Sequence, residues 1–233
     1  MIVFYAANLT ETSATLAEDE FQHCCKVLRN KIGDRIHLTN GQGTFAEGEL
    51  VQIKKQLAQV NVLSTKQIAP SAQSTHLYVC PPKNRSRWEW LIEKSVELGV
   101  DSITPLITYH TERGKINETR TQKILRSAAL QSTRPYHPTL HPPIKWAQLL
   151  KLPQLAKHDK YLAHYLDSNP NLIDQKPKSA SASILVGPEG DFSNQETEEA
   201  KALGFQLVNI SKYRLRTETA AVAVVNILKQ MGY

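Results

Sequence analysis

Apolar and polar residues alternate in short runs along the first third of the chain. Runs with a two-residue period predict β-strands over Arg35–Thr39, Thr44–Leu50 and Leu57–Leu63. The segment Asn40-Gly41-Gln42-Gly43 between the first two runs is typical of a hairpin turn. A helix over Glu18–Leu28 is expected before these strands, so this part of the chain is predicted to fold as a small β-barrel.

The pattern changes after a polar stretch, Ser64–Thr75, which is interpreted as a linker. Strand patterns and helix patterns then alternate to the end of the chain. The predicted strands are His76–Cys80, Ser102–Ile107, Lys160–Ala163, Ser183–Gly187 and Gln206–Ile210, and the predicted helices are Ser86–Leu98, Glu118–Ser132, Asn194–Leu203 and Glu218–Met231. The fold class is therefore α/β, with a β-barrel domain over 1–68 and a second domain over 75–233 whose mostly parallel sheet is covered by helices.

Chemical signals mark the ends of some of these helices. Ser193-Asn194-Gln195-Glu196 fits a capping box, and Gly204 is placed to end the same helix. In the helix over Ser86–Leu98, the two tryptophans Trp88 and Trp90 are interpreted as packing residues. A long polar stretch, Asp167–Ser183, is either a mobile lid or a disordered surface loop.

The net charge of +6 is unevenly placed. Residues 1–70 hold seven Lys or Arg and seven Asp or Glu, whereas residues 71–233 hold 21 and 15, so the second domain carries the whole excess. This surplus suits an anionic partner such as RNA, although a solvated basic face is the alternative.

Several classes of protein are excluded or disfavoured. The longest apolar run, Ala220–Val225, is too short to span a membrane, and the first residues lack the features of a signal peptide. Three cysteines form neither a disulfide framework nor a zinc pattern, so inert thiols in a reducing cytoplasm are expected. Nucleotide triphosphatase, zinc protease and α/β-hydrolase motifs are absent, and no metal is required.

Two loops near the C-terminus are the most informative segments. Gly187-Pro188-Glu189-Gly190 and Leu215-Arg216-Thr217-Glu218-Thr219-Ala220 each join a predicted strand to a predicted helix. Ligands of open α/β sheets bind at such strand ends. The glycines allow a close approach of the backbone to a ligand or a positive φ, and the second loop begins a helix with hydroxyls and free N–H groups.

These two loops, extended to Ser193 and back to Arg214, resemble the RsmE family of ribosomal RNA methyltransferases, which belongs to the SPOUT superfamily. Weaker similarity upstream, around His23 to Asp34 and Trp90 to Val100, extends the resemblance over nearly the whole chain. It implies a PUA-like RNA-binding barrel, a knotted α/β domain and the cofactor S-adenosylmethionine (SAM). The knot rests on this resemblance alone.

The resemblance implies that three loops bind SAM. Their candidate cofactor-binding residues are Leu162, Ala163 and His164 in the first, Gly187, Pro188, Glu189 and Gly190 in the second, and Ile210, Ser211, Leu215, Arg216, Thr217, Glu218, Thr219 and Ala220 in the third. The candidate RNA-binding residues are Arg29, Lys83, Arg85, Arg87, Arg120, Lys123 and Arg126. The chain also departs from the family pattern, since Asp191 follows Gly190 where the family usually has glycine, and Tyr165 follows His164 where it has glutamate.

The implied function is SAM-dependent methylation of N3 of a uridine in small-subunit (16S) ribosomal RNA. The catalytic candidates are Arg216, which either stabilises the uridine anion or orients an RNA phosphate, and Glu189, which either accepts the proton or ties the backbone together. A SPOUT enzyme acting on another atom, such as the ribose 2′-oxygen, and a non-catalytic ribosome-assembly factor are the alternatives. The apolar last helix and the resemblance also predict a homodimer.

Overall fold

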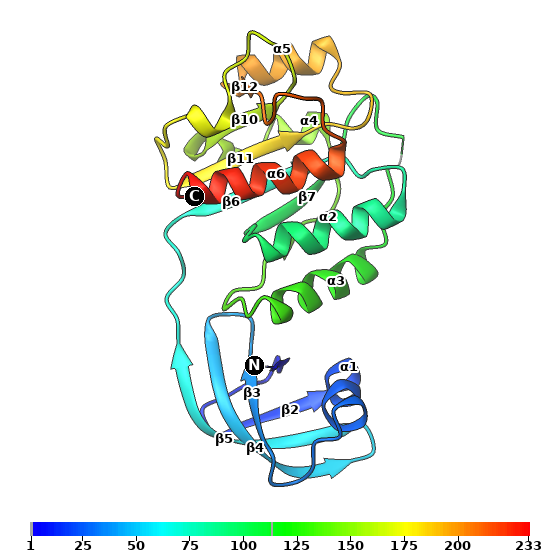
Figure 1. Ribbon diagram of the computed structural model, residues 1–233, viewed down its shortest axis with the longest axis vertical. Coiled ribbons are helices and arrows are strands. Elements are labelled where there is room, and N and C mark those ends of the chain that lie inside the picture. Colours follow the sequence, from blue (N-terminus) through cyan, green and yellow to red (C-terminus); the bar gives the residue numbers. More distant parts are fainter. Residues whose placement is uncertain (1, 113) are drawn as a thin grey trace. The chain divides into compact units, whose positions relative to one another are not determined.

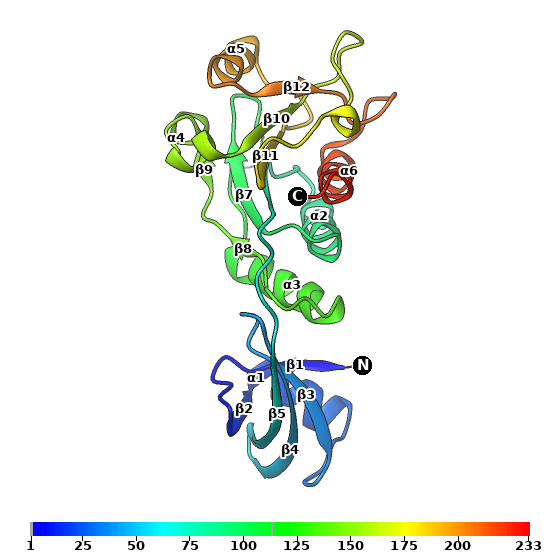
Figure 2. The same ribbon diagram turned by 90° about the vertical axis from the view of Figure 1, so that its left-hand side faces the viewer.

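The structure is a computed structural model in which residues 2–112 and 114–233 are described. The chain forms two compact units (Figures 1 and 2). The first consists of Met1–Pro70 and Ala129–His137, and the second of Ser71–Ala128 and Pro138–Tyr233.

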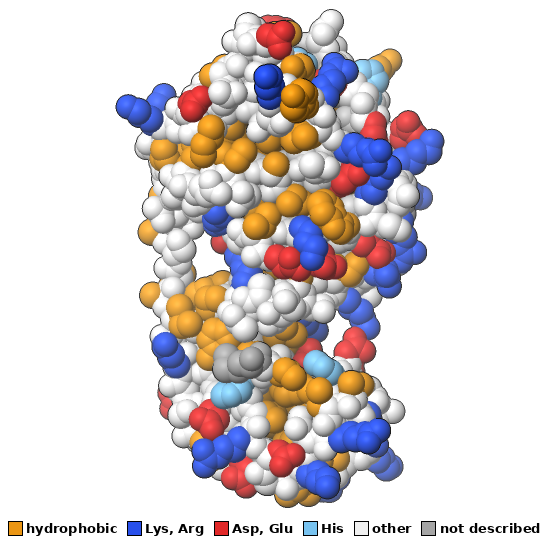
Figure 3. Space-filling model, in the orientation of Figure 1, with side chains coloured by type: hydrophobic (Ala, Val, Ile, Leu, Met, Phe, Trp, Pro, Cys, Tyr) orange, Lys and Arg blue, Asp and Glu red, His pale blue; other side chains and the backbone are white. Residues whose placement is uncertain are grey.

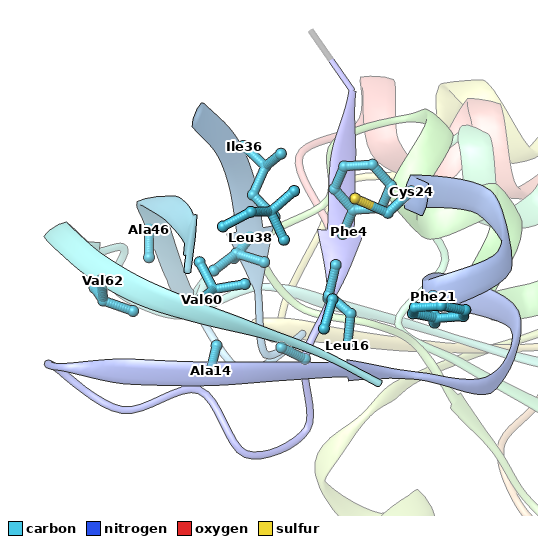
Figure 4. Close-up of a cluster of buried hydrophobic side chains, with 13 residues drawn as sticks. Phe4, Ala14, Leu16, Phe21, Cys24, Ile36, Leu38, Ala46, Val60 and Val62 are labelled. Atoms are coloured by element: carbon cyan, nitrogen blue, oxygen red, sulfur yellow. The ribbon is translucent and has the colours of Figure 1, made fainter. Parts of the chain in front are cut away.

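The first unit is built on a five-stranded sheet with the order β1-β3-β4-β5-β2. Its elements are β1 (Val3–Tyr5), β2 (Ser13–Ala17), α1 (Glu18–Phe21), a π-helical continuation (Gln22–Val27), β3 (Arg35–Thr39), β4 (Thr44–Lys54) and β5 (Leu57–Gln67). Figure 4 shows Phe4, Leu16, Leu38 and Val60 pointing toward one another from four of these strands. Since side chains alternate between the faces of a strand, the two-residue period places one apolar face in this core.

The predicted strands and the helix of this unit are present, but the unit contains two further strands and the linker after it is shorter than predicted. The short strands β1 and β2 were not predicted, because three and five residues show too little periodicity. The linker is shorter than predicted, since β5 continues to Gln67 and the next strand begins at Ser74. The polar residues Ser64–Gln67 pair with β4 and leave their side chains in solvent, which hides the strand from a hydrophobic pattern.

A segment distant in sequence completes the first unit. The loop that we predicted as a hairpin turn binds it through its backbone, with the N–H of Gly43 donating to the carbonyl of Pro135 at 2.8 Å. The hydroxyl of Tyr136 also donates to the carbonyl of Ile68 at 2.9 Å. Residues 129–137 lie within the range that the sequence assigns to the second domain.

The second unit contains a seven-stranded sheet, with the order β12-β10-β11-β6-β7-β8 and β9 paired to β7. All of these pairs are parallel. Its strands are β6 (Ser74–Val79), β7 (Ser102–Ile107), β8 (Thr139–Leu140), β9 (Ile144–Lys145), β10 (Asp159–Ala163), β11 (Ser181–Val186) and β12 (Gln206–Val208). The main helices are α2 (Arg85–Glu97), α3 (Glu118–Gln131), α4 (Trp146–Leu149), α5 (Asn194–Ala202) and α6 (Thr217–Gln230).

Helices cover both faces of this sheet, as Figure 2 shows with α2 and α6 on one side and α4 on the other. The predicted capping box is confirmed, since Ser193 and Glu196 bond each other's backbone N–H groups, and Gly204 follows α5 with a φ of 83°. Trp88 is buried, as predicted for a packing residue, and its ring N–H donates to the hydroxyl of Thr121. The same prediction is wrong for Trp90, which is 43% exposed. They are two positions apart, about 200° around a helix, so they face opposite sides.

The stretch Asp167–Ser183 is not disordered. Leu172 is fully buried, and the amide of Asn209 donates to the carbonyls of Leu166 and Asn169 at 2.8 and 3.0 Å. The last three residues of the stretch belong to β11. Elsewhere, no helix within residues 2–112 or 114–233 is long and apolar enough to cross a membrane.

Candidate functional site

The carboxyl ends of three adjacent parallel strands form the site. Ala163, the last residue of β10, is in register with Val186 of β11 and Val208 of β12. The three following loops therefore leave the sheet side by side and enclose a cavity of about 490 Å³. Its lining residues are Ala163, His164, Tyr165, Gly187, Pro188, Glu189, Gly190, Asp191, Val208, Ile210, Ser211, Tyr213, Arg214, Leu215, Arg216, Thr217 and Ala220.

Hydrogen bonds between segments hold these loops in place. The hydroxyl of Thr217, the first residue of α6, donates to the carbonyl of Gly187 at 3.0 Å. The hydroxyl of Tyr165 donates to the carbonyl of Lys212 at 3.1 Å. The carboxylate of Glu189 accepts the backbone N–H of Lys83 at 3.3 Å, which supports the interpretation that this glutamate ties the backbone together. These bonds fix the loops around the cavity.

The two glycines of the second loop lie where a side chain would crowd neighbouring residues. Neither Gly187 nor Gly190 is among the residues with positive φ. A Cβ atom at Gly187 would lie 3.0 Å from the ring of Phe192, and one at Gly190 would lie 3.1 Å from Cβ of His110. The absent side chains therefore allow the loop to lie close to these neighbouring protein groups.

Arg216 occupies the N-cap position of α6 and lines the cavity. Its side chain makes no capping bond, and within the described part of the chain its guanidinium has no hydrogen bond or ion pair. An unpaired guanidinium beside the free N–H groups of a helix start creates a positive region. Such a region suits a developing anion or a phosphate.

The imidazole of His164 in the first loop and the carboxylate of Asp191 beside the second loop meet at the cavity. Oδ2 of Asp191 lies 3.0 Å from Nδ1 of His164. Asp191 has a φ of 61°, a left-handed conformation that few residues other than glycine adopt readily. This explains why glycine is common at that position in the family and shows that aspartate is accommodated here.

Twelve of the fifteen candidate cofactor-binding residues line the cavity, and three do not. Leu162 is fully buried in the core, because side chains alternate along β10. Glu218 is turned toward Arg87, with Oε1 3.3 Å from Nε, and Thr219 is exposed on the first turn of α6. The other lining residues are Tyr165, which belongs to the first predicted loop, and Asp191, Val208, Tyr213 and Arg214, which were not among the candidate residues.

The candidate RNA-binding residues of the second unit are largely held by acidic partners. Arg85 and Arg120 both bind Glu89, the latter through two nitrogens at 2.5 and 2.8 Å. Hydrogen bonds from Arg120, and then from Arg85, lower the pKa of Glu89 to about 2. Lys83 pairs with Glu112 at 2.8 Å. Arg120 is therefore held in an ion pair, whereas Arg29 in the first unit is exposed.

Comparison with known proteins identifies the family. The model of the family described as "RNA methyltransferase domain" matches residues 69–229. The chain belongs to this RNA methyltransferase family. A second model, "RNA methyltransferase PUA domain", matches residues 16–63.

Individual relatives are similar over most of their length. "Ribosomal RNA small subunit methyltransferase E" of Buchnera aphidicola is 27% identical over 93% of this chain and 87% of its own. The crystal structure of a probable rRNA-methyltransferase from Porphyromonas gingivalis has a TM-score of 0.89 at 29% identity, covering 99% and 98% of the two chains. A Neisseria gonorrhoeae Ribosomal RNA small subunit methyltransferase E, solved bound to S-adenosyl methionine, has a TM-score of 0.87 at 29% identity, again covering 99% and 98%.

These findings confirm the resemblance to the RsmE family and the α/β fold with an N-terminal PUA-like domain and a C-terminal SPOUT-type domain. The trefoil knot stays a prediction.

Proposed function

We propose that this protein is a SAM-dependent methyltransferase that methylates N3 of a specific uridine in small-subunit (16S) ribosomal RNA. The main support is the cavity at the carboxyl ends of β10, β11 and β12, in a chain of the RNA methyltransferase family. The proposed domains are the PUA-like barrel over 1–68 and the SPOUT domain over 75–233.

The cavity fits SAM in volume and in chemistry. Cavities of roughly 300–1,000 Å³ with apolar walls and a few polar groups are usual for small ligands and cofactors. Ala163, Val208, Ile210 and Leu215 supply apolar walls here, and Arg216 with the start of α6 supplies positive charge. These walls suit the adenine ring, while backbone groups at the strand ends suit its polar edge. The fit supports SAM as the cofactor.

Methylation of N3 places two demands on the protein. SAM supplies an electrophilic methyl group, but N3 of uridine carries a proton that must be removed. The resulting negative charge spreads over N3 and the adjacent carbonyl oxygens. The guanidinium of Arg216 is placed to stabilise this charge or to hold an RNA phosphate, and it stays protonated at any relevant pH. Because a base pair hides N3, the target uridine is unpaired or turned out of its stack.

A methyl-transfer assay tests the function. The substrate is small-subunit RNA from a strain lacking this modification, and the modified nucleoside is identified by mass spectrometry. We expect N3-methyluridine at one position. A methyl group on a ribose 2′-oxygen would favour the alternative SPOUT activity, and specific RNA binding without transfer would favour an assembly factor.

Cofactor binding is expected to stabilise the protein. At SAM concentrations of about 100 times the dissociation constant, the free energy of unfolding should rise by roughly 2.7 kcal/mol. Ala220→Leu adds a larger side chain to the cavity wall without disturbing the helix, and should abolish this gain. Ala202→Leu on the exposed face of α5 is the matched control. The stabilisation is measured by thermal denaturation with and without SAM. Equal stabilisation of both variants would place the cofactor elsewhere.

Lys123 and Arg126 remain proposed phosphate contacts on α3, and Arg29 on the barrel. The double variant Lys123→Gln, Arg126→Gln should lower the salt dependence of RNA affinity by about 1.4–1.8 units of log–log slope. The slopes are measured by filter binding from low to moderate salt. An unchanged slope in the double variant would assign both residues to a solvated surface.

We further propose a cytoplasmic homodimer. Burial raises the pKa of the Cys24 thiol to about 11 and that of the Cys80 thiol to about 12, which keeps both thiols unreactive. Unreactive free thiols are consistent with the reducing cytoplasm that we propose. Hydrophobic side chains are visible over the region of α2 and α6 in Figure 3. On α6, Ala223 and Ile227 are partly exposed. A second subunit would cover this surface.

A further inference from the structure

The carboxylate of Asp191 is fixed in direction at the wall of the cavity. Its Oδ1 accepts the N–H of Phe192 at 2.8 Å, and its own N–H donates to the carbonyl of Pro188 at 3.0 Å. Its carbonyl oxygen lies 3.0 Å from Nδ1 of His110. These contacts hold the left-handed backbone and leave Oδ2 directed toward His164. Strained conformations that the surroundings maintain are concentrated at functional sites.

His164 is fixed in the same way at the end of β10. Its N–H donates to the carbonyl of Val208 at 3.1 Å, and its carbonyl accepts the amide of Asn169 at 2.8 Å. The imidazole is 24% exposed, with Nδ1 fully buried 3.0 Å from Asp191. The ring N–H is not aligned with the carboxylate, so this contact is electrostatic and not a hydrogen bond. Catalytic hydrogen bonds are often misaligned in this way until substrate is bound.

The other ring nitrogen of His164 is available. Within residues 2–112 and 114–233, Nε2 has no hydrogen-bond partner. A carboxylate beside Nδ1 favours the tautomer with its proton on Nδ1, which leaves a lone pair on Nε2. Imidazole is also the side chain that most readily accepts and releases a proton near neutral pH. The pair thus has the arrangement of a general base and the group that orients it.

We infer that His164 is the proton acceptor of the reaction and that Asp191 is its positioning residue. The N3–H bond of uridine breaks, its proton moves to Nε2 of His164, and the electron pair left on N3 forms the bond to the transferred methyl group. The imidazolium is stabilised by Asp191 and afterwards releases the proton to water. The inference rests on the proposed function and adds the acceptor that it lacks.

The other polar groups around the cavity suit this role less well. Glu189 already accepts the backbone N–H of Lys83, and Arg214 and Arg216 are cations. The remaining titratable side chains are those of Tyr165 and Tyr213, with His110 on the carbonyl side of Asp191. Among the described residues that line the cavity, His164 is the one imidazole, and its Nε2 has no hydrogen-bond partner.

Three variants test the inference by turnover. His164→Gln should lower kcat at saturating SAM and RNA by about 100-fold or more, the usual range for a general base. The wild-type rate should rise with pH, as expected for a reaction that needs a deprotonated base, and the variant should lose this rise. Asp191→Asn and Asp191→Gly should each lower kcat at least tenfold. Asp191→Gly suits the positive φ and so guards against misfolding as the cause.

A spectroscopic readout is independent of activity. In the ligand-free protein, ¹⁵N NMR reports which ring nitrogen of His164 carries the proton; we expect Nδ1 in the wild type and a shift toward Nε2 in Asp191→Gly. His141→Gln, an exposed histidine outside the cavity, is the matched control for both measurements. Near-normal kcat and an unchanged pH profile in His164→Gln would overturn the inference, as would an unchanged tautomer in Asp191→Gly. Failure of the wild type to bind SAM or methylate RNA would instead contradict the proposed function.

Discussion

Replacing Arg216 with lysine is expected to lower turnover at least ~100-fold, the usual scale for losing one preorganised charge stabiliser. Lysine keeps the positive charge but loses the planar, bidentate fork of the guanidinium. Since Arg216 begins α6 on the cavity wall and has no partner in the described part of the chain, no internal contact is lost with it. SAM affinity should change little, because the substitution acts on the charge that develops during transfer.

Kinetics and calorimetry together check this expectation. Turnover is measured at saturating SAM and RNA, and the affinity for SAM is measured separately by titration calorimetry. Arg35→Lys, an exposed arginine of the first unit paired with Glu47, controls for a general effect of the substitution. Turnover within threefold of the wild type would remove Arg216 from the mechanism, whereas a loss of SAM affinity alone would make it a cofactor ligand.

Local sequence signals predicted the elements of the second unit closely. The strand over Ser102–Ile107 has the predicted bounds, and α5 and α6 each begin within one residue of the prediction. Strands with continuous apolar runs, capping residues and glycines are all local features, so they can be read from one stretch of sequence. The same reasoning located both loops of the site, because loops at the carboxyl ends of parallel strands converge.

Contacts between distant segments could not be predicted in this way. His164 and Asp191 lie on different loops, and only the parallel register of β10 and β11 brings them together. Arg120 was expected to project from α3, but its partner Glu89 lies on another helix. The scattered histidines likewise gave no indication that His76 and His158 would stack at 4.6 Å. Each of these contacts depends on tertiary structure, which hydrophobic periodicity does not encode.

The last helix shows how the structure changes an expectation about assembly. An apolar helix against a sheet suggests that its outer side meets a second subunit. However, α6 contacts α2 as well as β6 and β11, so the chain itself covers much of its surface. Val224 is fully buried among these contacts, while Ala223 beside it remains partly exposed. The two positions therefore separate folding from assembly.

Val224→Glu is expected to destabilise the fold by on the order of 3–5 kcal/mol, because it places an unpaired charge in the core. This is a large part of the stability of about 5–15 kcal/mol of a typical domain, so the variant should unfold at much lower urea concentration. Ala223→Glu should leave the urea midpoint nearly unchanged. If the proposed dimer forms through this surface, Ala223→Glu should also yield monomers by light scattering at micromolar concentration.

The control for this pair of variants is Gln230→Glu on the exposed side of α6. Lys229 is unsuitable, since its ammonium group binds Asp101 at 2.7 Å. A wild-type protein with monomer mass would refute the dimer, and a dimeric Ala223→Glu would place the subunit contact on another surface. A normal urea midpoint for Val224→Glu would show that α6 is not packed as described. The loops that α6 shares with the cavity would then lack the support that holds Thr217 against Gly187.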